Sequence, residues 1–407
     1  MRILQLCHKP PRPAIDGGCI AMDNLTKGLV EAGHDVKILC ASTHKHPFRP
    51  SELSKVYKKI TSVEAVYIDT RLNFVDAFSN LITRDSYNIS RFFSPDFDMK
   101  LERILRKDDD FDIIQLESLF MTPYISTVRR FSKSKIILRS HNLEYKIWQR
   151  MAKVSSTGPK KAYLNLLAKR LKEYEVSIMG QVDGIATISP EDTGHYMDLG
   201  CDIPIETVPF GIDSASYEVS HPYNFDNTLF HLGAMDWMPN IEGVEWFLRE
   251  IWPSIKSEHP ELKLHLAGKA SNHYQIDKDT RSVVLDGEVE CAKKYMQSKG
   301  IMIVPLLSGG GIRIKIIEGM ALGKVIISTS IGAEGIGVTN GKNILLADSP
   351  AEFQKCLNDL LVNPHLMNEL SRNARSFIER NFDNSILTRN LLAFYSKIQT
   401  AELEVLN

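Results

Sequence analysis

Apolar and polar positions in the first half of the chain form a repeating order of short apolar runs and amphipathic segments. The runs RILQLC (2–7) and DVKILCAS (35–42) have the length of buried strands. Between them, residues 19–34 have helical spacing, and Gly33 is a helix-stop signal. A strand, a helix and a second strand in this order form a βαβ unit, so the pattern predicts a parallel sheet covered by helices. Further strands of this series are expected at 111–118, 135–142 and 182–189.

A second series of the same kind begins after about residue 222. Its expected strands lie at 228–235, 262–269, 282–289, 300–307 and 324–330. Residues 240–255 have the spacing of one amphipathic helix, and residues 385–406 indicate a long final helix. Residues 208–227 contain Pro, Gly, Ser and Asn without any period, which is typical of a boundary. The predicted fold class is therefore α/β, with two consecutive Rossmann-like domains at 1–215 and 222–385.

Size and composition agree with this layout. At 407 residues the chain is longer than one hydrophobic core usually organises, and 43% hydrophobic and 24% charged residues are ordinary for a globular protein. The formal net charge of −1 gives no reason to expect a nucleic acid partner. The six cysteines lack metal-finger spacing, the N-terminal apolar run is short for a signal peptide, and no run has the ~18 apolar residues of a membrane span. We therefore expect a cytoplasmic protein with reduced thiols.

The segment PLLSGGGIRIKIIEG (305–319) combines three glycines, two cations and a carboxylate at a strand end. Ligands of parallel sheets bind beyond the carboxyl ends of strands, and a helix beginning near Gly310 would offer free N–H groups to an anion. Arg313, expected in the first turn, and Lys315 would add positive charge. Glu318, on the same helix face, suits the hydroxyls of a ribose. The alternative is a glycine-rich turn with a surface ion pair between Lys315 and Glu318. The spacing is neither that of a Walker loop nor that of a dinucleotide-binding fingerprint.

The longer segment PLLSGGGIRIKIIEGMALGKVIISTSIGAEGI resembles the donor site of retaining glycosyltransferases of family 4, which have the GT-B fold. DGG, LRSHNLE, ATISPED, VPFGIDSASY and HLGAMDWMPNIEGVEWFL resemble further landmarks of that family in the same order, so the similarity covers essentially the whole chain. The resemblance implies two Rossmann-like domains that face each other across a cleft. The N-terminal domain would take the acceptor and be completed by the final helix, at about 390–407, and the C-terminal domain would bind the nucleotide-sugar donor.

The same resemblance implies the reaction and its partners. A sugar would pass from a nucleotide diphosphate-sugar to a hydroxyl of a glycan or polyprenyl diphosphate-linked acceptor, in bacterial surface polysaccharide synthesis. No cofactor and no catalytic metal are implied. Two alternatives stay open: a nucleotide-sugar 2-epimerase of the same architecture, and a non-catalytic nucleotide-sugar-binding protein.

The resemblance also implies functional residues, by their positions in the motifs quoted above. The residues implied for donor binding are Gly17, Gly18, Gly309, Gly310, Gly311 and Glu318, and those implied for catalysis are His141, Arg313 and Lys315. Two positions depart from the pattern of many family members. Gly310 stands where they carry a first glutamate, and 233–240 lacks their arginine and lysine. We expect these departures to increase the importance of Arg313 and Lys315 for charge.

Candidates for the acceptor side lie in the first domain. They are Glu117, Arg139, Asn142 and Glu144, all at or near predicted strand ends. Glu117 has an equal alternative as a loop-capping carboxylate, and Ser189 is first a helix-cap candidate. Basic residues crowd 129–174, which suits either an anionic membrane surface at the inner face of the cytoplasmic membrane or a solvated helix face. In the acidic segment 107–114 the aspartate triplet precedes the strand, so we interpret it as a solvated loop and not as a metal site.

Overall fold

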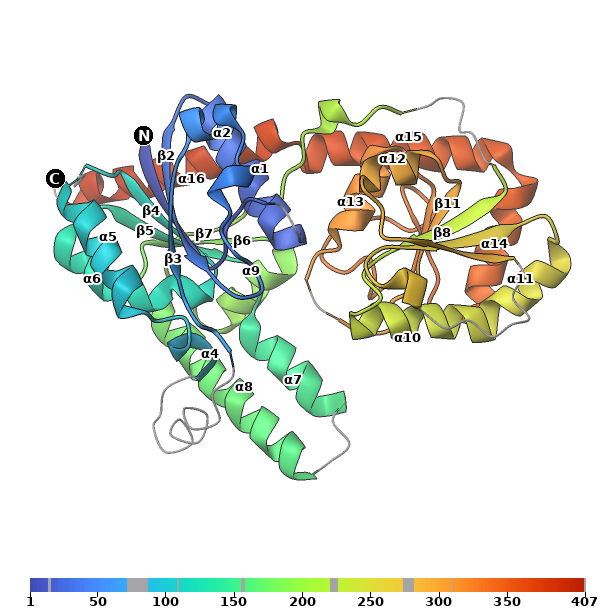
Figure 1. The fold of residues 1–407 in the computed structure, drawn as a ribbon, viewed down its shortest axis with the longest axis horizontal. Coiled ribbons are helices and arrows are strands. Elements are labelled where there is room, and N and C mark those ends of the chain that lie inside the picture. The colour runs from blue at the N-terminus through green and yellow to red at the C-terminus, as the bar shows by residue number, and fades with distance from the viewer. Residues whose placement is uncertain are drawn as a thin grey trace. The chain divides into compact units, whose positions relative to one another are not determined.

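The computed structural model divides the chain into two compact units, which are described separately. Unit 1 comprises Met1–Gly211 and Asn384–Asn407, and unit 2 comprises Ile212–Asp383 (Figure 1). The structure describes residues 1–13, 16–71, 87–107, 110–154, 158–219, 226–273, 282–309 and 311–405.

Unit 1 is built on a sheet of seven parallel strands in the order β3-β2-β1-β4-β5-β6-β7. The strands are β1 (Arg2–Cys7), β2 (Asp35–Ser42), β3 (Ser62–Tyr67), β4 (Ile113–Glu117), β5 (Lys135–Ser140), β6 (Gly184–Thr187) and β7 (Ile205–Thr207). The helices are α1 (Gly17–Glu31), α2 (Lys55–Ile60), α4 (Tyr87–Ser90), α5 (Pro95–Lys107), α6 (Ile125–Phe131), α7 (Glu144–Val154), α8 (Gly158–Met179), α9 (Pro190–Asp198) and α16 (Asn384–Val405).

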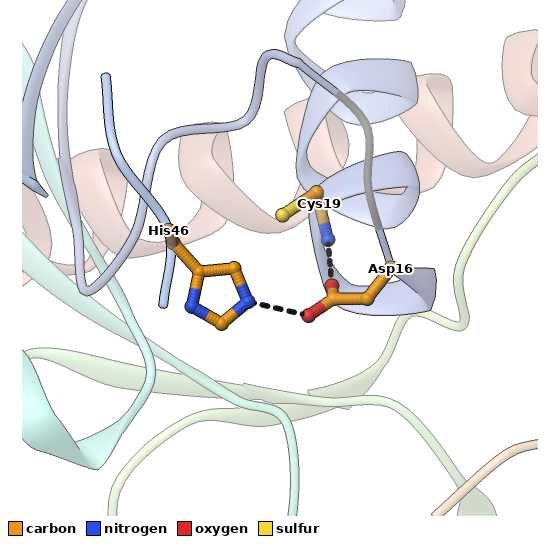
Figure 2. A group of neighbouring side chains, drawn as sticks. All are labelled: Asp16, Cys19 and His46. Atoms are coloured by element: carbon orange, nitrogen blue, oxygen red, sulfur yellow. Dashed lines mark hydrogen bonds and ion pairs between the residues drawn. The ribbon is translucent and has the colours of Figure 1, made fainter. Parts of the chain in front are cut away.

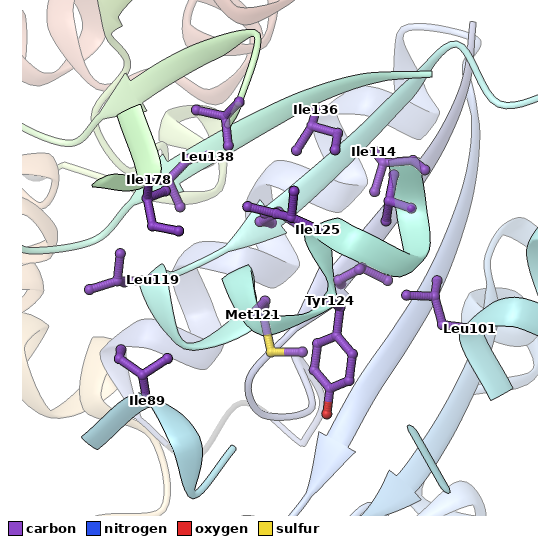
Figure 3. Packing of buried hydrophobic residues seen from close by; sticks show 14 of the residues in the cluster. Ile89, Leu101, Ile114, Leu119, Met121, Tyr124, Ile125, Ile136, Leu138 and Ile178 are labelled. Atoms are coloured by element: carbon purple, nitrogen blue, oxygen red, sulfur yellow. The ribbon is translucent and has the colours of Figure 1, made fainter. Parts of the chain in front are cut away.

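Alternate residues of the central strands enter two separate cores, because successive side chains of a strand point to opposite faces. On one face, Ile114, Ile136 and Leu138 pack against Tyr124 and other buried residues (Figure 3). On the other face, neighbouring strand positions pack against α1 and α16. The final helix of the chain therefore completes the hydrophobic cover of unit 1.

Unit 2 has a second parallel sheet, of six strands in the order β10-β9-β8-β11-β12-β13. The strands are β8 (Thr228–Leu232), β9 (Lys263–Ala267), β10 (Val283–Gly287), β11 (Ile301–Val304), β12 (Ile326–Ser328) and β13 (Leu345–Leu346). The helices are α10 (Met238–Trp246), α11 (Trp252–Glu258), α12 (Ala292–Gln297), α13 (Ile314–Ala321), α14 (Pro350–Val362) and α15 (Pro364–Asn381). Both units have the parallel-sheet architecture that the sequence predicted.

The prediction of a single helix at 240–255 is wrong in detail. A π-helical turn at Phe247–Ile251 separates α10 from α11. Pro253 lies in the first turn of α11, where its missing N–H is not needed for a helical hydrogen bond. In the middle of one continuous α-helix the same proline would remove a bond and clash with the preceding turn.

Candidate functional site

The glycine segment of unit 2 follows β11, whose neighbour in the sheet is β8. Helix α13 begins at Ile314 with Arg313 as its N-cap residue, so the expected start near Gly310 and the placement of Arg313 in the first turn are wrong. The reason is backbone conformation, because Gly309 has φ +113° and Gly311 has φ +79°, values that a right-handed helix excludes. Gly310 itself lies outside the described residues.

Close packing around Gly309 leaves no space for a side chain. A Cβ at this position would lie 2.7 Å from Nη2 of Arg313 and 3.2 Å from the Trp237 ring. Arg313 is buried, donates from Nη1 to the carbonyl oxygen of Gly311, and has its guanidinium 5.4 Å from the centre of the Trp237 ring. The arginine is therefore held against the glycine turn by a backbone carbonyl and by the face of an aromatic ring.

Lys315 projects from the first turn of α13 toward β8 and α10. Its Nζ donates to Oδ1 of Asn240 at 3.1 Å and lies 3.5 Å from Nε2 of His231. Burial, with the nearby charge of Arg313, lowers the pKa of Lys315 to about 7. Among the described residues, Lys315 makes no ion pair with a carboxylate, so the interpretation as a surface ion pair with Glu318 is wrong.

Glu318 lies one turn further along α13 and has a different partner. Its Oε1 accepts a hydrogen bond from the Tyr217 hydroxyl at 3.1 Å. Burial raises the pKa of the Glu318 carboxyl, while the hydrogen bond from Tyr217 opposes that rise. The side chain is thus fixed by a neutral donor, and a second oxygen is left to accept hydroxyl groups.

The strand ends of unit 1 bring an acid and a histidine together. Glu117 is the last residue of β4, and His141 follows β5, the next strand in the sheet. Nε2 of His141 lies 2.7 Å from Oε2 of Glu117, whose side chain is fully buried. The Gln115 amide donates to the other carboxylate oxygen, and Nδ1 of His8, after β1, donates to the Glu117 carbonyl at 2.8 Å. Glu117 therefore orients His141. The sequence had suggested only an acceptor contact or a loop-capping role for Glu117.

The other candidates of unit 1 are bound within it. Arg139 is fully buried, donates from Nη2 to the carbonyl oxygen of Pro209 at 3.1 Å, and stacks 5.4 Å from the Phe210 ring centre. Glu144 begins α7, and burial raises its pKa to about 7 against the effect of a hydrogen bond from Asn142. These contacts position the segment after β5, and roles toward an acceptor stay predictions.

Buried Glu175 of α8 holds the start of α7. Its two carboxylate oxygens accept from the backbone N–H groups of Glu144, at 3.0 Å, and Tyr145, at 3.2 Å. Burial raises the pKa of Glu175 to about 8, although these two hydrogen bonds act in the opposite direction. The burial of Glu175 could not be predicted from its position in the chain, because an isolated glutamate in a helix is ordinarily exposed.

Gly17 and Gly18, which the resemblance assigned to donor binding, form the first turn of α1. Asp16 caps this turn: it accepts from the backbone N–H of Cys19 at 2.9 Å and from Nε2 of His46 at 2.9 Å (Figure 2). It also accepts from Nζ of Lys9 at 2.8 Å. Burial alone would raise the pKa of Asp16, but the bonds from His46 and Lys9 lower it. A Cβ at Gly18 would lie 2.7 Å from Nζ of Lys9, so glycine permits this contact.

Asp16, Cys19 and His46 are the one group of three potential metal ligands in the described part of the chain. Two features favour an internal network over a cation site. The Lys9 ammonium contacts both oxygens of Asp16, and burial raises the pKa of Cys19 to about 12, which keeps the thiol protonated. The group therefore fixes the start of α1.

Several residues that complete these arrangements were not found from the sequence. They are His8, Glu175, Tyr217, His231, Trp237 and Asn240. His231 carried a weak signal, since it interrupts an otherwise apolar buried strand. Ser189 caps α9 by accepting from the N–H of Asp192, which confirms the helix-cap interpretation. All six cysteines are free, as expected.

Comparisons with known proteins agree with this architecture. The family described as Glycosyltransferase Family 4 matches residues 15–216, and the one described as Glycosyl transferases group 1 matches residues 226–363. A protein of Klebsiella pneumoniae named "Uncharacterized 44.6 kDa protein in cps region" is 26% identical over 403 residues, covering 94% of this chain and 97% of its own.

Solved structures show the same fold at low sequence identity. Anabaena HepE, in a structure described as a complex with UDP and glucose, has a TM-score of 0.66 at 12% identity and covers 97% of this chain and 99% of its own. Sucrose-phosphate synthase from Thermosynechococcus elongatus has a TM-score of 0.71 at 13% identity, with 98% and 100% covered. 

The two parallel-sheet units have the GT-B fold, which the chain shares with these structures. By the two family matches, the chain belongs to the glycosyltransferases of the group 1, family 4 type. None of the helices, as far as the chain is described, is long and apolar enough to cross a membrane.

Proposed function

We propose that the enzyme is a retaining glycosyltransferase that moves a hexose-like sugar from a nucleotide diphosphate-sugar to a hydroxyl of a glycan or lipid-linked acceptor. The observation that carries the proposal is the pair of basic side chains beside the glycine turn at the start of α13, buried Arg313 and partly buried Lys315. Buried cations next to free helix N–H groups suit a diphosphate. HepE, described with UDP and glucose, supports a nucleotide-sugar donor. The relative from a cps region supports a role in bacterial surface polysaccharide synthesis.

Charge is the main difficulty of this reaction. When the bond between the sugar and the diphosphate breaks, its electron pair passes to the diphosphate oxygen. Arg313 and Lys315 stabilise the charge that develops there without a metal ion, and Glu318 accepts from the ribose hydroxyls. The acceptor hydroxyl attacks the same face of the sugar, and its proton passes to the leaving phosphate. His141, oriented by Glu117, contacts the donor sugar.

The membrane-facing part of the proposal concerns helices α7 and α8, which pack against each other in unit 1 (Figure 1). Lys153, Lys161, Lys169 and Lys172 are exposed on them. An anionic membrane surface attracts such a cluster. Lys169 lies 4.0 Å from Glu173, and nearby Arg129 is bound to Asp183 at 2.9 Å. Co-sedimentation with anionic vesicles that is lost in a quadruple lysine-to-glutamine variant would support this contact, and equal binding by the variant would contradict it.

A thermal-shift panel of nucleoside diphosphates and nucleotide-sugars tests the donor site. A ligand at about 100 times its dissociation constant adds roughly 2.7 kcal/mol of stability, which raises the unfolding midpoint visibly. We expect one base to stabilise the protein, Lys315→Ala to lose that gain, and Lys342→Ala, at an exposed lysine of unit 2, to keep it. A panel without any shift, or a shift that Lys315→Ala retains, would contradict the donor site.

A further inference from the structure

The Lys315 amine has two neutral acceptors and, among the described residues, no carboxylate partner. Oδ1 of Asn240 lies 3.1 Å from Nζ, and Nε2 of His231 lies 3.5 Å from it. A neutral amine has two N–H donors, which matches two acceptors, whereas an ammonium has three donors. Among the described residues, the surroundings therefore offer as many acceptors as the neutral amine has N–H donors, and one fewer than the charged form has.

His231 is fixed in the state that accepts from Lys315. It lies fully buried in β8, and its Nδ1 donates to the carbonyl oxygen of Ile303 on β11 at 3.1 Å. With the proton on Nδ1, Nε2 has the lone pair that faces the amine. Burial, and then the charge of Lys315, lowers the pKa of His231 well below its usual range, so this ring stays neutral.

A second hydrogen bond likewise fixes the orientation of the Asn240 amide. Its Nδ2 donates to the carbonyl oxygen of Ala234 at 2.8 Å, which turns Oδ1 toward Lys315. Gly233 leaves the space for both acceptors, since a Cβ there would lie 2.6 Å from Nδ2 of Asn240 and 2.9 Å from Nε2 of His231. The segment 233–240, which lacks the arginine and lysine of other family members, thus shapes the surroundings of Lys315.

Two nearby charged residues, Arg313 and Glu318, do not act as acceptors for the Lys315 amine. Arg313 repels a charged Lys315, which favours the neutral amine. Glu318, on the same helix, is bonded to the Tyr217 hydroxyl. Burial acts in the same direction as Arg313, and the two together lower the pKa of Lys315 to about 7.

We propose that His231 and Asn240 are positioning residues that hold Lys315 as a neutral amine, and that Lys315 takes up a proton when a diphosphate binds. This inference rests on the proposed function of the same site. The proton comes from solvent and adds to the amine lone pair, and the new N–H donates to a phosphate oxygen. The charge is therefore created only when the anion that needs it is present, which avoids a buried, uncompensated ammonium in the empty site.

Calorimetry in buffers of different ionisation enthalpy measures this proton directly. The probe is whichever of UDP, GDP, ADP, CDP and dTDP stabilises the protein, titrated into the full chain and into Lys315→Arg, whose guanidinium is always charged. Subtracting the variant cancels protons exchanged by the nucleotide itself. From a pKa of about 7, we expect the difference to be about 0.9 proton taken up at pH 8 and about 0.1 at pH 6.

Asn240→Asp tests the positioning role. A carboxylate in place of the amide would keep Lys315 charged in the empty site, so proton uptake should disappear and affinity should fall. Asn340→Asp, at an exposed asparagine that likewise accepts through Oδ1, should leave both unchanged. If Asn240→Asp does not fold, the pH dependence of affinity decides: it should weaken from pH 7 to pH 9 in the natural chain and stay flat in Lys315→Arg.

The outcomes separate the two claims. If no nucleoside diphosphate binds, the proposed function fails. If one binds and the proton difference between the natural chain and Lys315→Arg is zero at pH 8, the function stands and this inference is overturned. Unchanged proton uptake in a folded Asn240→Asp variant would overturn the positioning role.

Discussion

The candidate residues of unit 1 and those of unit 2 differ in how their charged groups are matched. In unit 1, the His141 ring is bound to a buried carboxylate, and that carboxylate is bound in turn to Gln115. In unit 2, Lys315 has only neutral acceptors among the described residues, and Glu318 has only a neutral donor. The first arrangement is complete without a ligand, whereas in the second a charged Lys315 is matched only when an anion is added. Unit 1 thus holds a preoriented histidine, and unit 2 offers basic groups for an anion.

The largest effect that sharpens this comparison is expected for His141→Ala. If His141 acts on the sugar during reaction, turnover should fall about 100-fold while the stabilisation by donor stays the same. Steady-state kinetics together with the thermal shift measure both quantities. His44→Ala, at an exposed histidine of the same unit, is the control and should change neither. Loss of donor binding in His141→Ala would contradict the division of roles.

Glu117→Gln should have a smaller effect in the same direction. The amide keeps the shape but cannot hold a charged or correctly oriented imidazole as a carboxylate does, so we expect turnover to fall about 10-fold. A shift in the pH profile of turnover would identify the loss as electrostatic. An unchanged rate and profile would mean that the contact is structural only.

Tyr217→Phe tests the hydrogen bond that the Tyr217 hydroxyl donates to Glu318 in unit 2. Losing the hydroxyl that fixes Glu318 should weaken a nucleoside diphosphate about 5-fold, the cost of about 1 kcal/mol for one hydrogen bond. Inorganic pyrophosphate, which has no ribose, should bind equally to both proteins. A competition assay with the two ligands measures the difference, and equal weakening of both would show that Tyr217 does not act through the ribose.

The smallest effect concerns stability and pH in unit 1. The pKa of Glu175 is raised from 4.5 to about 8 in the folded chain. Between these two pH values the folded chain therefore keeps a proton that the unfolded chain has lost. This contribution is present below pH 4.5 and is lost as pH rises to about 8, and Glu144, with a pKa of about 7, adds to it. These two acids therefore make the unfolding midpoint decline from pH 5 to pH 8, while the lowered pKa values of His231 and Lys315 act in the opposite direction.

Glu175→Gln should flatten that decline, because an amide has no proton to lose. Glu173→Gln, at an exposed residue two positions earlier on α8, should leave the slope as it is. Thermal unfolding at intervals of half a pH unit measures the slopes. Equal slopes in the natural chain and Glu175→Gln would rule out Glu175 as the source.

The fold was predicted best where strands are buried on both faces, since such strands are continuous apolar runs. The strands that the sequence missed, β3, β7 and β13, all lie at sheet edges. The partly exposed residues of β3 and β7 give no continuous apolar run, whereas β13 is only two residues long. Strand ends and glycines likewise indicated where site residues would lie. The partners of these site residues could not be predicted. Lys315 and His231 are 84 residues apart in the chain and come together only because β8 pairs with β11.

The most direct test of the central claim is product analysis by NMR. The donor identified by thermal shift is incubated with the enzyme, first alone and then with a lipid-linked glycan fraction as acceptor. We predict that the nucleoside diphosphate is released and that the sugar is joined to the acceptor with the anomeric configuration of the donor. A 2-epimer of the sugar still attached to the nucleotide would contradict the account in favour of an epimerase, and a bound but unchanged donor would contradict it in favour of a binding protein.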